Sequence, residues 1–598
     1  MSSHQIEGLL AWISNLFSPT NYHWKSRKNI PYLLASLLIV LWQALQAYSY
    51  GTSRTYMVQD DARQHVFWMQ RWIDANLFSN DLIADYFQSV APWGYQGVYK
   101  VFVWFGIDPL QAAKIAPGLI AALATLLFFR LILKLAPVPF LGFLGCLLLN
   151  QALWLEDGII SGTPRAFVYP WLIGFLDGFL GESVIEMSIF MGLQALFYPQ
   201  ALLLAIATLT LSFFKHVKHK KKRIKALLPW LFSLGILGLL VTARNLGGND
   251  NFSPVLSVEM ARELPELGYV NGEYGRSFFF HRNPVIFWLF SPRSGLLSLG
   301  ILNPLLLISF ALPWLLRSPY NSNIASRLNP KLKRIGYFIG ASLLMFLTAH
   351  LVLFQLHLPA RYTYYSFRLS LILLGAIATG LLLEKWWHSI QSWKINRQWR
   401  WIQGSAAVLL LLIIGLGWLP LSKGFTVYSH LQIKGRIGDI YEFLKGQPKD
   451  ILVASLAKEA DNIPTFAQRS VLAASEYAIP YHWGYYQQLR QRIEDTIVAQ
   501  YSSDLNVIAD FIDQYEVDYW LVETWKLSLE EFQKSPRLQQ FDPTSSEVMD
   551  SLKAGEQPIL PIFYESCTAV EQKDQRLLDA RCIRKTIAAL SAQQEEGR

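Results

Sequence analysis

Charge and cysteine are both scarce in this sequence. Only 16% of the 598 residues are charged and 52% are apolar, whereas roughly a quarter of a soluble globular protein is charged. This composition excludes a single soluble domain, a disordered chain and a small disulfide-rich peptide. The three cysteines form no CxxC and no cluster with metal-ligand spacing. No glycine-rich nucleotide-binding motif occurs, so we do not expect a nucleotide-driven pump.

Long apolar runs, by contrast, are abundant. A membrane-spanning helix needs about 20 mostly apolar residues, and runs of this kind lie near 31–49, 115–136, 137–155, 227–243, 294–316, 335–356, 366–383 and 403–421. The apolar stretch 167–214 is broken at Gly181 and at Tyr198, which predicts three helices. The sequence therefore predicts a polytopic α-helical membrane protein with about 11 transmembrane helices, or nine if 167–214 crosses only once.

The net charge of +9 is concentrated in short segments between the apolar runs, which is typical of membrane topology and not of a nucleic-acid partner. Twenty-one Lys and Arg residues but only two acids occur in the segments 1–30, 130–136, 215–225, 317–334 and 384–401. The positive-inside rule assigns these segments to the cytoplasm. The N-terminus is then cytoplasmic, and the protein is expected in the inner or plasma membrane. Residues 1–30 are either an amphipathic surface segment or a frayed tail.

The same orientation divides the chain into domains. Residues 31–421 form the transmembrane domain, with long outer loops at 50–114 and 244–293. Residues 422–598 are polar, which together with their candidate elements predicts an extracytoplasmic α/β domain. The candidate strands lie at 451–454, 471–474 and 517–522, and the candidate amphipathic helices lie near 437–446, 485–500 and 505–515. That oxidising side of the membrane permits a disulfide between Cys567 and Cys582, the alternative being two free thiols.

Two adjacent acids, Asp60 and Asp61, follow the first apolar run by about ten residues. Two carboxylates held together near a membrane surface suit a general base or a site for a cationic or metal-bound group. The structural alternative is a helix N-terminus, with Asp60 as its cap. His65 and Asp85 in the same loop are candidate substrate-binding residues.

Other outer segments carry candidate phosphate ligands. Arg165 follows Gly162 and Pro164, which let the backbone approach a ligand, although a lone arginine at a membrane face also snorkels. Arg361 lies in a short outer link beside Tyr362, and arginine suits bidentate phosphate binding, whereas the tyrosine fits an interfacial aromatic belt. The break at Tyr198 suggests a cavity, because a broken helix at membrane depth lies beside protein or water.

With these features the sequence resembles the GT-C superfamily of integral-membrane glycosyltransferases, in particular its uncharacterised bacterial branches. The resemblance covers most of residues 1–421 and rests on the outer acidic loop, on Ser161–Phe167 and on Leu358–Thr363. It implies transfer of a sugar from a polyprenyl phosphate to an envelope acceptor at the outer face, with inversion. Asp60 is then the general base with Asp61 as partner or alternate, and Arg165 and Arg361 stabilise the leaving phosphate. A divalent cation, Mg or Mn, is permitted by the two acids but not required.

Two further hypotheses remain. The chain is also compatible with a transporter or flippase of lipid-linked saccharide, and with a non-catalytic envelope scaffold. Transporters usually carry ionisable residues near the bilayer midplane, whereas here Asp177 is an exception among the spans and the acids gather in an outer loop. This distribution favours the enzyme.

Overall fold

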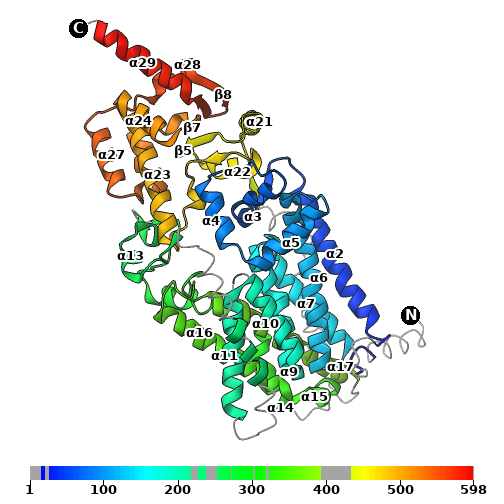
Figure 1. Cartoon of the computed structure of the whole chain (residues 1–598). Helices are drawn as coiled ribbons and strands as arrows, with labels where there is room; N and C mark the ends of the chain where they lie inside the picture. Colours follow the sequence, from blue (N-terminus) through cyan, green and yellow to red (C-terminus); the bar gives the residue numbers. More distant parts are fainter. Residues whose placement is uncertain are drawn as a thin grey trace.

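The computed structural model of the chain describes residues 15–19, 26–216, 227–229, 231–232, 234–236, 252–270, 273–298, 300, 304–317, 322–391 and 432–596. The described part is mostly helical. Apolar helices form one end of the molecule and a smaller domain with a mixed sheet forms the other (Figure 1). The short helices of the first outer loop lie where the two parts meet.

The helices of the apolar part follow the hydropathy of the sequence. They are α2 (Ile30–Gly51), α6 (Pro109–Leu135), α7 (Pro139–Trp154), α9 (Val168–Gly181), α10 (Val184–Phe197), α11 (Pro199–His216), α16 (Ile335–Leu351) and α17 (Arg361–Gln391). Three helices therefore occupy the stretch 167–214, as its two breaks predict. Glu182 ends α9 in a left-handed conformation with φ of 59°, and Pro199 begins α11, because a proline is tolerated at a helix start.

Four helical stretches in the described residues are long and apolar enough to cross a membrane, namely Ile30–Gly51, Pro109–Leu135, Pro330–Leu351 and Arg361–His388. Shorter apolar helices accompany them, so the total of 11 spans stays a prediction. The run expected at 403–421, most of 227–243 and most of the N-terminal segment 1–30 lie outside the described residues.

The expected span at 294–316 is wrong as a single helix. Residues 292–297 are mostly turns. Among the described residues of this run, helical structure comprises the 3-10 helix η6 (Pro304–Ala311) and α14 (Leu312–Arg317), which follows directly. Hydropathy measures the length of an apolar run and misses such an interruption.

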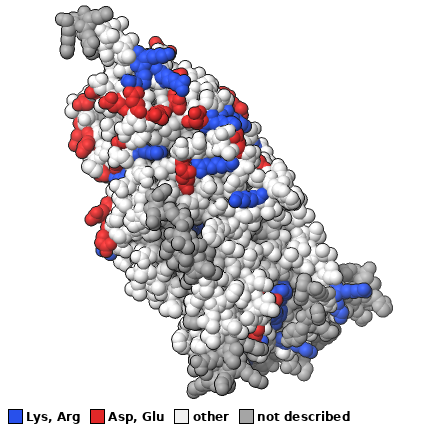
Figure 2. All heavy atoms as spheres, viewed as in Figure 1, with Lys and Arg blue, Asp and Glu red and all other residues white. Residues whose placement is uncertain are grey.

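The outer surface of the apolar part matches a lipid environment. Leu34, Leu38, Leu41 and Leu45 of α2 are exposed along one helical face, whereas nearly every residue of α7 is buried. On the face drawn in Figure 2, charged side chains gather over the mixed-sheet domain and near the opposite end, and the surface between them is almost entirely uncharged. A band of this kind is the surface that a bilayer covers.

The first outer loop is built of short elements. They are β1 (Met57–Gln59), α3 (Asp60–Val66), the 3-10 helix η1 (Phe67–Trp72), α4 (Leu82–Val90) and α5 (Trp93–Trp104). β1 pairs antiparallel with β4 (Gln432–Lys434) at the beginning of the C-terminal domain, Met57 opposite Lys434. Backbone hydrogen bonds between two segments far apart in the sequence thus fix the acidic loop against that domain.

The C-terminal domain has a five-stranded sheet with the order β6-β5-β7-β9-β8. The strands are β5 (Leu452–Ser455), β6 (Ser470–Val471), β7 (Tyr519–Glu523), β8 (Thr568–Gln572) and β9 (Gln575–Asp579). β5 runs parallel to both β6 and β7, and the β8-β9 hairpin is added antiparallel. The expected helices occur as α21 (Gly438–Gly446), α23 (Trp483–Tyr501) and α24 (Leu505–Tyr515). The hairpin and α29 (Ala580–Glu596) were not expected from the sequence.

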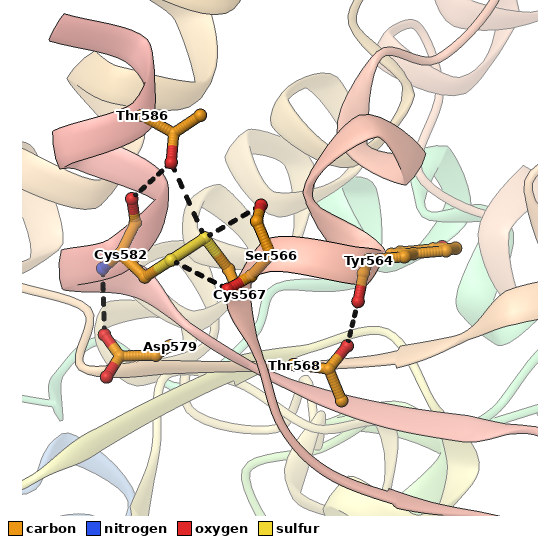
Figure 3. Close-up of a disulfide and its surroundings, with 7 residues drawn as sticks. All are labelled: Tyr564, Ser566, Cys567, Thr568, Asp579, Cys582 and Thr586. Atoms are coloured by element: carbon orange, nitrogen blue, oxygen red, sulfur yellow. Dashed lines mark hydrogen bonds between the residues drawn. A yellow bond between two sulfur atoms is a disulfide. The ribbon is translucent and has the colours of Figure 1, made fainter. Parts of the chain in front are cut away.

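A disulfide joins Cys567 and Cys582 in this domain, with their Cα atoms 5.4 Å apart (Figure 3). Cys567 precedes β8 and Cys582 lies in the first turn of α29. The bond therefore connects the end of one short helix to the beginning of the terminal helix, across the β8-β9 hairpin.

Replacing both cysteines with serine is expected to lower the free energy of unfolding of this domain by about 3 kcal/mol. The physical reason is that the disulfide closes a loop of 15 residues, which restricts the unfolded chain. Thermal unfolding of the full chain in detergent, for the variant and the wild type, measures the effect. An unchanged unfolding midpoint in oxidised wild type and variant would contradict it.

Candidate active site

The acidic pair opens helix α3. The Gln59 side chain caps this helix by accepting the backbone N–H of Ala62 at 2.9 Å. Asp60 and Asp61 are therefore the first two helical residues, and the expectation that Asp60 is the cap is wrong. Gln59 takes that place because it is the last, extended residue of β1, with φ of −69° and ψ of 143°. Both carboxylates lie at the positive end of the helix dipole, which stabilises their negative charge.

The two carboxylates point to different partners. Asp60 Oδ1 lies 2.8 Å from Nη2 of Arg63, and 49% of the Asp60 side chain is exposed. Asp61 is 24% exposed and forms an ion pair with Arg165. The same guanidinium lies 3.1 Å from Oδ2 of Asp157, a residue that begins the short helix α8 (Asp157–Ile160). Arg165 thus connects the acidic loop with the segment between α7 and α9.

A glycine brings Arg165 to this position. Gly162 has a φ of 62°, and a Cβ there would lie 3.0 Å from Oη of Tyr99 and 3.1 Å from the carbonyl oxygen of Ala113. Only glycine takes up this backbone conformation and close approach without strain. The chain then turns into the 3-10 helix η2 (Pro164–Phe167), which carries Arg165 toward Asp61.

Asp157 also connects the acidic loop with Arg361. Burial raises the pKa of the Asp157 carboxyl, the positive charge of Arg361 lowers it, and the negative charges of Glu156 and Asp60 raise it further. Arg361 in turn interacts electrostatically with Tyr198, Tyr365 and Asp157. The first outer loop, the segment after α7 and the beginning of α17 therefore surround one polar site.

Further positive charge lies beside Arg361. The Arg293 carbonyl accepts the backbone N–H of Ala360 at 3.2 Å. Burial lowers the pKa of the Arg293 guanidinium, and the positive charges of Arg276 and Arg361 lower it further. His357 is kept neutral, because burial and then the positive charges of Arg361, Arg165 and Arg293 lower its pKa to about 3. Several like charges in one place disfavour one another, and an anionic group between them would relieve this repulsion.

The C-terminal domain contributes to the site through Glu476. Its Oε2 lies 2.8 Å from Nη2 of Arg63 and its Oε1 lies 2.9 Å from Nη2 of Arg276. Arg63 therefore lies between Asp60 and Glu476, and its Nη1 also donates to Oδ1 of Asn462 at 2.8 Å. This network holds the Arg63 guanidinium in place, and through it the orientation of the Asp60 carboxylate.

Glu476 gives the protein a specific pH dependence. Burial raises its pKa from 4.5 to about 7, so the folded chain binds this proton more tightly than the unfolded chain does. The free energy of unfolding is therefore expected to fall as the pH rises from about 4.5 to about 7. Glu476→Gln should remove this part of the slope, as measured by thermal unfolding between pH 4 and 8. Glu556→Gln, at an exposed position of the same domain, is the control, and equal slopes in wild type and Glu476→Gln would contradict the assignment.

The other expected site residues differ in their surroundings: Tyr198 interacts with the arginines of the site, whereas Tyr362 and His65 have other contacts. Tyr198 ends α10 and interacts with Arg361 and Arg165. Tyr362 is buried, and its hydroxyl donates to the carbonyl of Leu356 at 3.0 Å, which is a structural contact. His65 packs edge-on against the Phe87 ring, and burial lowers its pKa to about 4.

Asp85 pairs with a different arginine from those that pair with Asp60 and Asp61. Its Oδ1 is 2.8 Å from Nη1 of Arg71, and 48% of its side chain is exposed. Arg71 donates in addition to the carbonyl of Phe78 and to the side chain of Gln88. This ion pair connects η1 with α4 within the first outer loop, so the contacts of Asp85 indicate a structural role.

Sequence reasoning missed several residues of the site. Asp157 lies eight residues before Arg165 in the sequence, but only the fold shows that it pairs with Arg165 and interacts electrostatically with Arg361. Arg293 and Glu476 lie in segments without a distinctive spacing. One signal was available for Arg293, since it is a single basic residue just before an apolar run. No signal pointed to Glu476.

A divalent cation does not fit the arrangement of the acidic pair. Each carboxylate already has an arginine partner, Arg63 for Asp60 and Arg165 for Asp61. In the part of the chain that the structure describes, no group of three or more His, Cys, Asp or Glu side chains is placed to hold a metal ion. Mg²⁺ is usually bound by one or two carboxylates together with waters and substrate phosphates, and here both carboxylates are already paired with arginines, so we derive no step through a metal.

Comparison with solved structures identifies the fold. ArnT from Cupriavidus metallidurans in the apo state superposes with a TM-score of 0.51 at 12% identity, covering 92% of this chain and 98% of ArnT. The same protein bound to undecaprenyl phosphate gives a TM-score of 0.44 at 14% identity, covering 74% and 85%. An apo oligosaccharyltransferase from Archaeoglobus fulgidus gives 0.48 at 12% identity, covering 88% and 73%.

No family model and no curated protein matches the sequence. The chain has the GT-C fold of integral-membrane glycosyltransferases, over most of its length and at low sequence identity. The apolar helices and this fold mark it as a multi-pass membrane protein. A fold alone does not establish an activity, which has to be argued from the site.

Proposed function

We propose that this chain is a membrane glycosyltransferase that moves a sugar from a polyprenyl phosphate to an acceptor at the outer membrane face. One observation carries the proposal. Arg165 pairs with both Asp61 and Asp157, and Asp157 interacts electrostatically with Arg361 and Asp60, which supports one site for the candidate base and the candidate phosphate ligands. The GT-C fold supports the reaction class, and ArnT, which has this fold, has been seen with undecaprenyl phosphate.

Asp60 is the general base in this proposal. Its carboxylate is half exposed, whereas that of Asp61 is more covered and paired with Arg165. A base needs an accessible lone pair within hydrogen-bond distance of the acceptor hydroxyl or amine. Asp61 then positions Arg165, and both remain close enough to Asp60 to shape the electrostatics of the reaction.

The reaction proceeds by inversion. Asp60 takes the proton of the acceptor hydroxyl or amine, and the acceptor atom attacks the anomeric carbon of the donor sugar. The bond between this carbon and the phosphate oxygen breaks, and its electron pair stays on the lipid phosphate. Arg165 and Arg361 stabilise the negative charge that develops there. Stabilisation of developing charge by fixed groups is usually the largest single contribution to the rate of an enzyme.

The arginines need partners while no phosphate is bound. Arg165 is paired with Asp61 and Asp157, and Arg361 interacts with Asp157. Arriving phosphate oxygens replace part of this carboxylate contact, since a guanidinium has five N–H donors. Asp157 thereby keeps both cations oriented and solvated by protein until the donor enters.

The topology that we propose places this site outside the cytoplasm. Residues 1–30 face the cytoplasm, 31–421 contain the spans, and 422–598 form the outer domain, in an inner or plasma membrane. The uncharged band in Figure 2 lies between the mixed-sheet domain and the opposite end of the molecule. A lipid-linked donor is then held with its tail in this band and its phosphate near Arg361. The acceptor, an envelope glycan, lipid or protein, approaches from the side of the outer domain.

Charged groups within the apolar part have structural partners, which weakens the transporter hypothesis. Asp177 is fully buried and forms ion pairs with Arg130 and with Lys134, the latter at 2.7 Å. Arg130 also lies 3.0 Å from Glu186. Buried charges that are paired in this way connect α6, α9 and α10 and require no transported ion.

The test uses purified full-length chain in nanodiscs with a panel of polyprenyl-phosphate sugars and an extract of envelope glycans. We expect release of polyprenyl phosphate from at least one donor. Binding of undecaprenyl phosphate, measured by native mass spectrometry, is the second readout. Folded protein that neither releases lipid phosphate from any donor nor binds undecaprenyl phosphate would refute the proposal.

A further inference from the structure

A cavity lies at the carboxyl ends of the parallel strands of the C-terminal domain. Its lining includes Ser455, the last residue of β5, Ala473–Ser475 just after β6, and Glu523, the last residue of β7. β6 and β7 lie on opposite sides of β5, so the connections leaving β5 and β6 diverge at this edge. In open α/β sheets, ligands bind at the carboxyl ends of strands where the strand order reverses in this way.

The size of the cavity fits a small molecule. Its volume is about 70 Å³, and one water needs roughly 10–15 Å³ of such space, so about five to seven waters fill it. Arg537 and Lys526 line it and have 40% and 33% of their side chains exposed. These partly exposed side chains bring the lining of the cavity into contact with solvent, so part of a ligand can project outward.

The charge of the lining favours an anion. Arg537 and Lys526 are positive, and Glu523 is the single acid among the residues that line the cavity. Lys526 Nζ lies 2.5 Å from Oε2 of Glu523, which leaves Arg537 as the excess cation. The guanidinium of Arg537 donates to the Ser475 hydroxyl and lies 3.9 Å from the carboxylate of Asp461.

Asp461 does not neutralise Arg537 completely, because it has other donors. Its Oδ1 accepts the backbone N–H of Glu476 at 2.8 Å, and both its oxygens accept from the Ser475 hydroxyl at 3.2 Å. A guanidinium has five N–H donors in a fork that matches a carboxylate or a phosphate. Arg537 thus has N–H groups available for an anionic group at the mouth of the cavity.

The rest of the lining contains both polar and apolar groups. Polar groups come from Ser455, Gln500 and Ser535, and apolar groups come from Ala473, Ala474, Leu538 and Phe541. A sugar presents this combination, because its ring carries hydroxyls on its edge and C–H groups on its faces. We propose that the cavity binds an acidic monosaccharide unit, in which Arg537 holds a carboxylate or a phosphate and the polar groups inside hold hydroxyls.

This site is distinct from the candidate active site and does not depend on the transferase reaction. The two are adjacent, since Ser475 of the cavity precedes Glu476, which forms the ion pair with Arg63. An acidic glycan held here would lie on the outer domain beside the acidic loop.

Isothermal titration calorimetry of the full-length chain in detergent, without any lipid donor, tests the proposal. The probes are glucuronate, glucose 6-phosphate, glucose and inorganic phosphate. We expect one or both acidic sugars to bind at least tenfold more tightly than glucose and than phosphate alone. The comparison of glucuronate with glucose 6-phosphate distinguishes a carboxylate from a phosphate as the anionic group.

Two variants complete the test. Arg537→Ala is expected to weaken binding of the acidic sugar by about tenfold or more, since it removes a charge-assisted hydrogen bond. Arg581→Ala, a control on α29 whose side chain is 79% exposed and paired with Asp518, should leave binding unchanged. Equal affinity for glucose, equal affinity for phosphate alone, or unchanged binding in Arg537→Ala would overturn the proposal. Asp60→Asn should bind the acidic sugar normally, so failure of this site and failure of the transferase function are distinguishable.

Discussion

Asp60→Asn is expected to lower the rate of lipid-phosphate release by about 10²–10⁴, the contribution of a positioned general base. Asparagine keeps the shape of the side chain and an oxygen that can accept from Arg63, but it cannot take a proton from the acceptor. The loss should appear in kcat with little change in KM for the lipid donor. Initial rates of polyprenyl phosphate release in nanodiscs measure it.

Two variants make this result specific. Asp74→Asn changes another acid of the first outer loop, one paired with Lys449 of the C-terminal domain, and should retain the wild-type rate. Asp61→Asn loses the charge that holds Arg165, so we expect it to raise KM for the donor as well as to lower kcat. If Asp60→Asn is as active as Asp74→Asn, while Asp61→Asn is inactive, the base has been assigned to the wrong residue.

Arg361→Ala should have the second largest effect, a reduction of about 10²–10³ in kcat/KM. Arg361 is expected to face the phosphate on which charge develops, and removal of one such fixed donor in an enclosed site costs about this much. Arg361→Lys keeps the positive charge but loses the planar fork, so it should recover only part of the activity. Kinetics with varied lipid donor separate the effect on binding from the effect on the reaction.

The control for this experiment is Arg262→Ala, at an exposed position of helix α13 (Val258–Glu263) in the loop 244–293. It removes one positive charge without touching the polar site, and we expect wild-type kinetics. Thermal unfolding of every variant must be compared with wild type, because Arg361 also interacts electrostatically with the buried carboxylate of Asp157. A folded Arg361→Ala variant with wild-type kcat/KM would exclude a phosphate-binding role for Arg361.

Local sequence patterns predicted the helices that depend only on the hydropathy of consecutive residues. The apolar runs at 31–49 and 115–136 became α2 and α6, because a run of that length must form a helix to satisfy its backbone in a bilayer. The β8-β9 hairpin was missed, since its strands TAVEQ and QRLLD are too polar to form a strong alternating pattern. The turns at 292–297 were missed because hydropathy does not register turns at the edge of an apolar run.

The candidate site was predicted only in part. Asp60, Asp61, Arg165 and Arg361 were found because unusual charges next to the ends of apolar runs require an explanation. Glu476 was not found, because it is 413 residues away from Arg63 along the chain and its own surroundings in the sequence are ordinary. Its importance comes from a contact that no spacing encodes.

The sequence by itself determined that this is a multi-pass membrane chain with an acidic loop after its first apolar helix and a polar C-terminal part, since hydropathy and charge placement are summed over consecutive residues. Only the tertiary structure decided which charges meet. It paired Asp61 with Arg165, put Asp157 beside Arg361 and fixed the acidic loop to the C-terminal domain through β1 and β4. The physical reason is that an ion pair acts over a few ångströms in space, and the fold alone sets that distance for residues hundreds of positions apart.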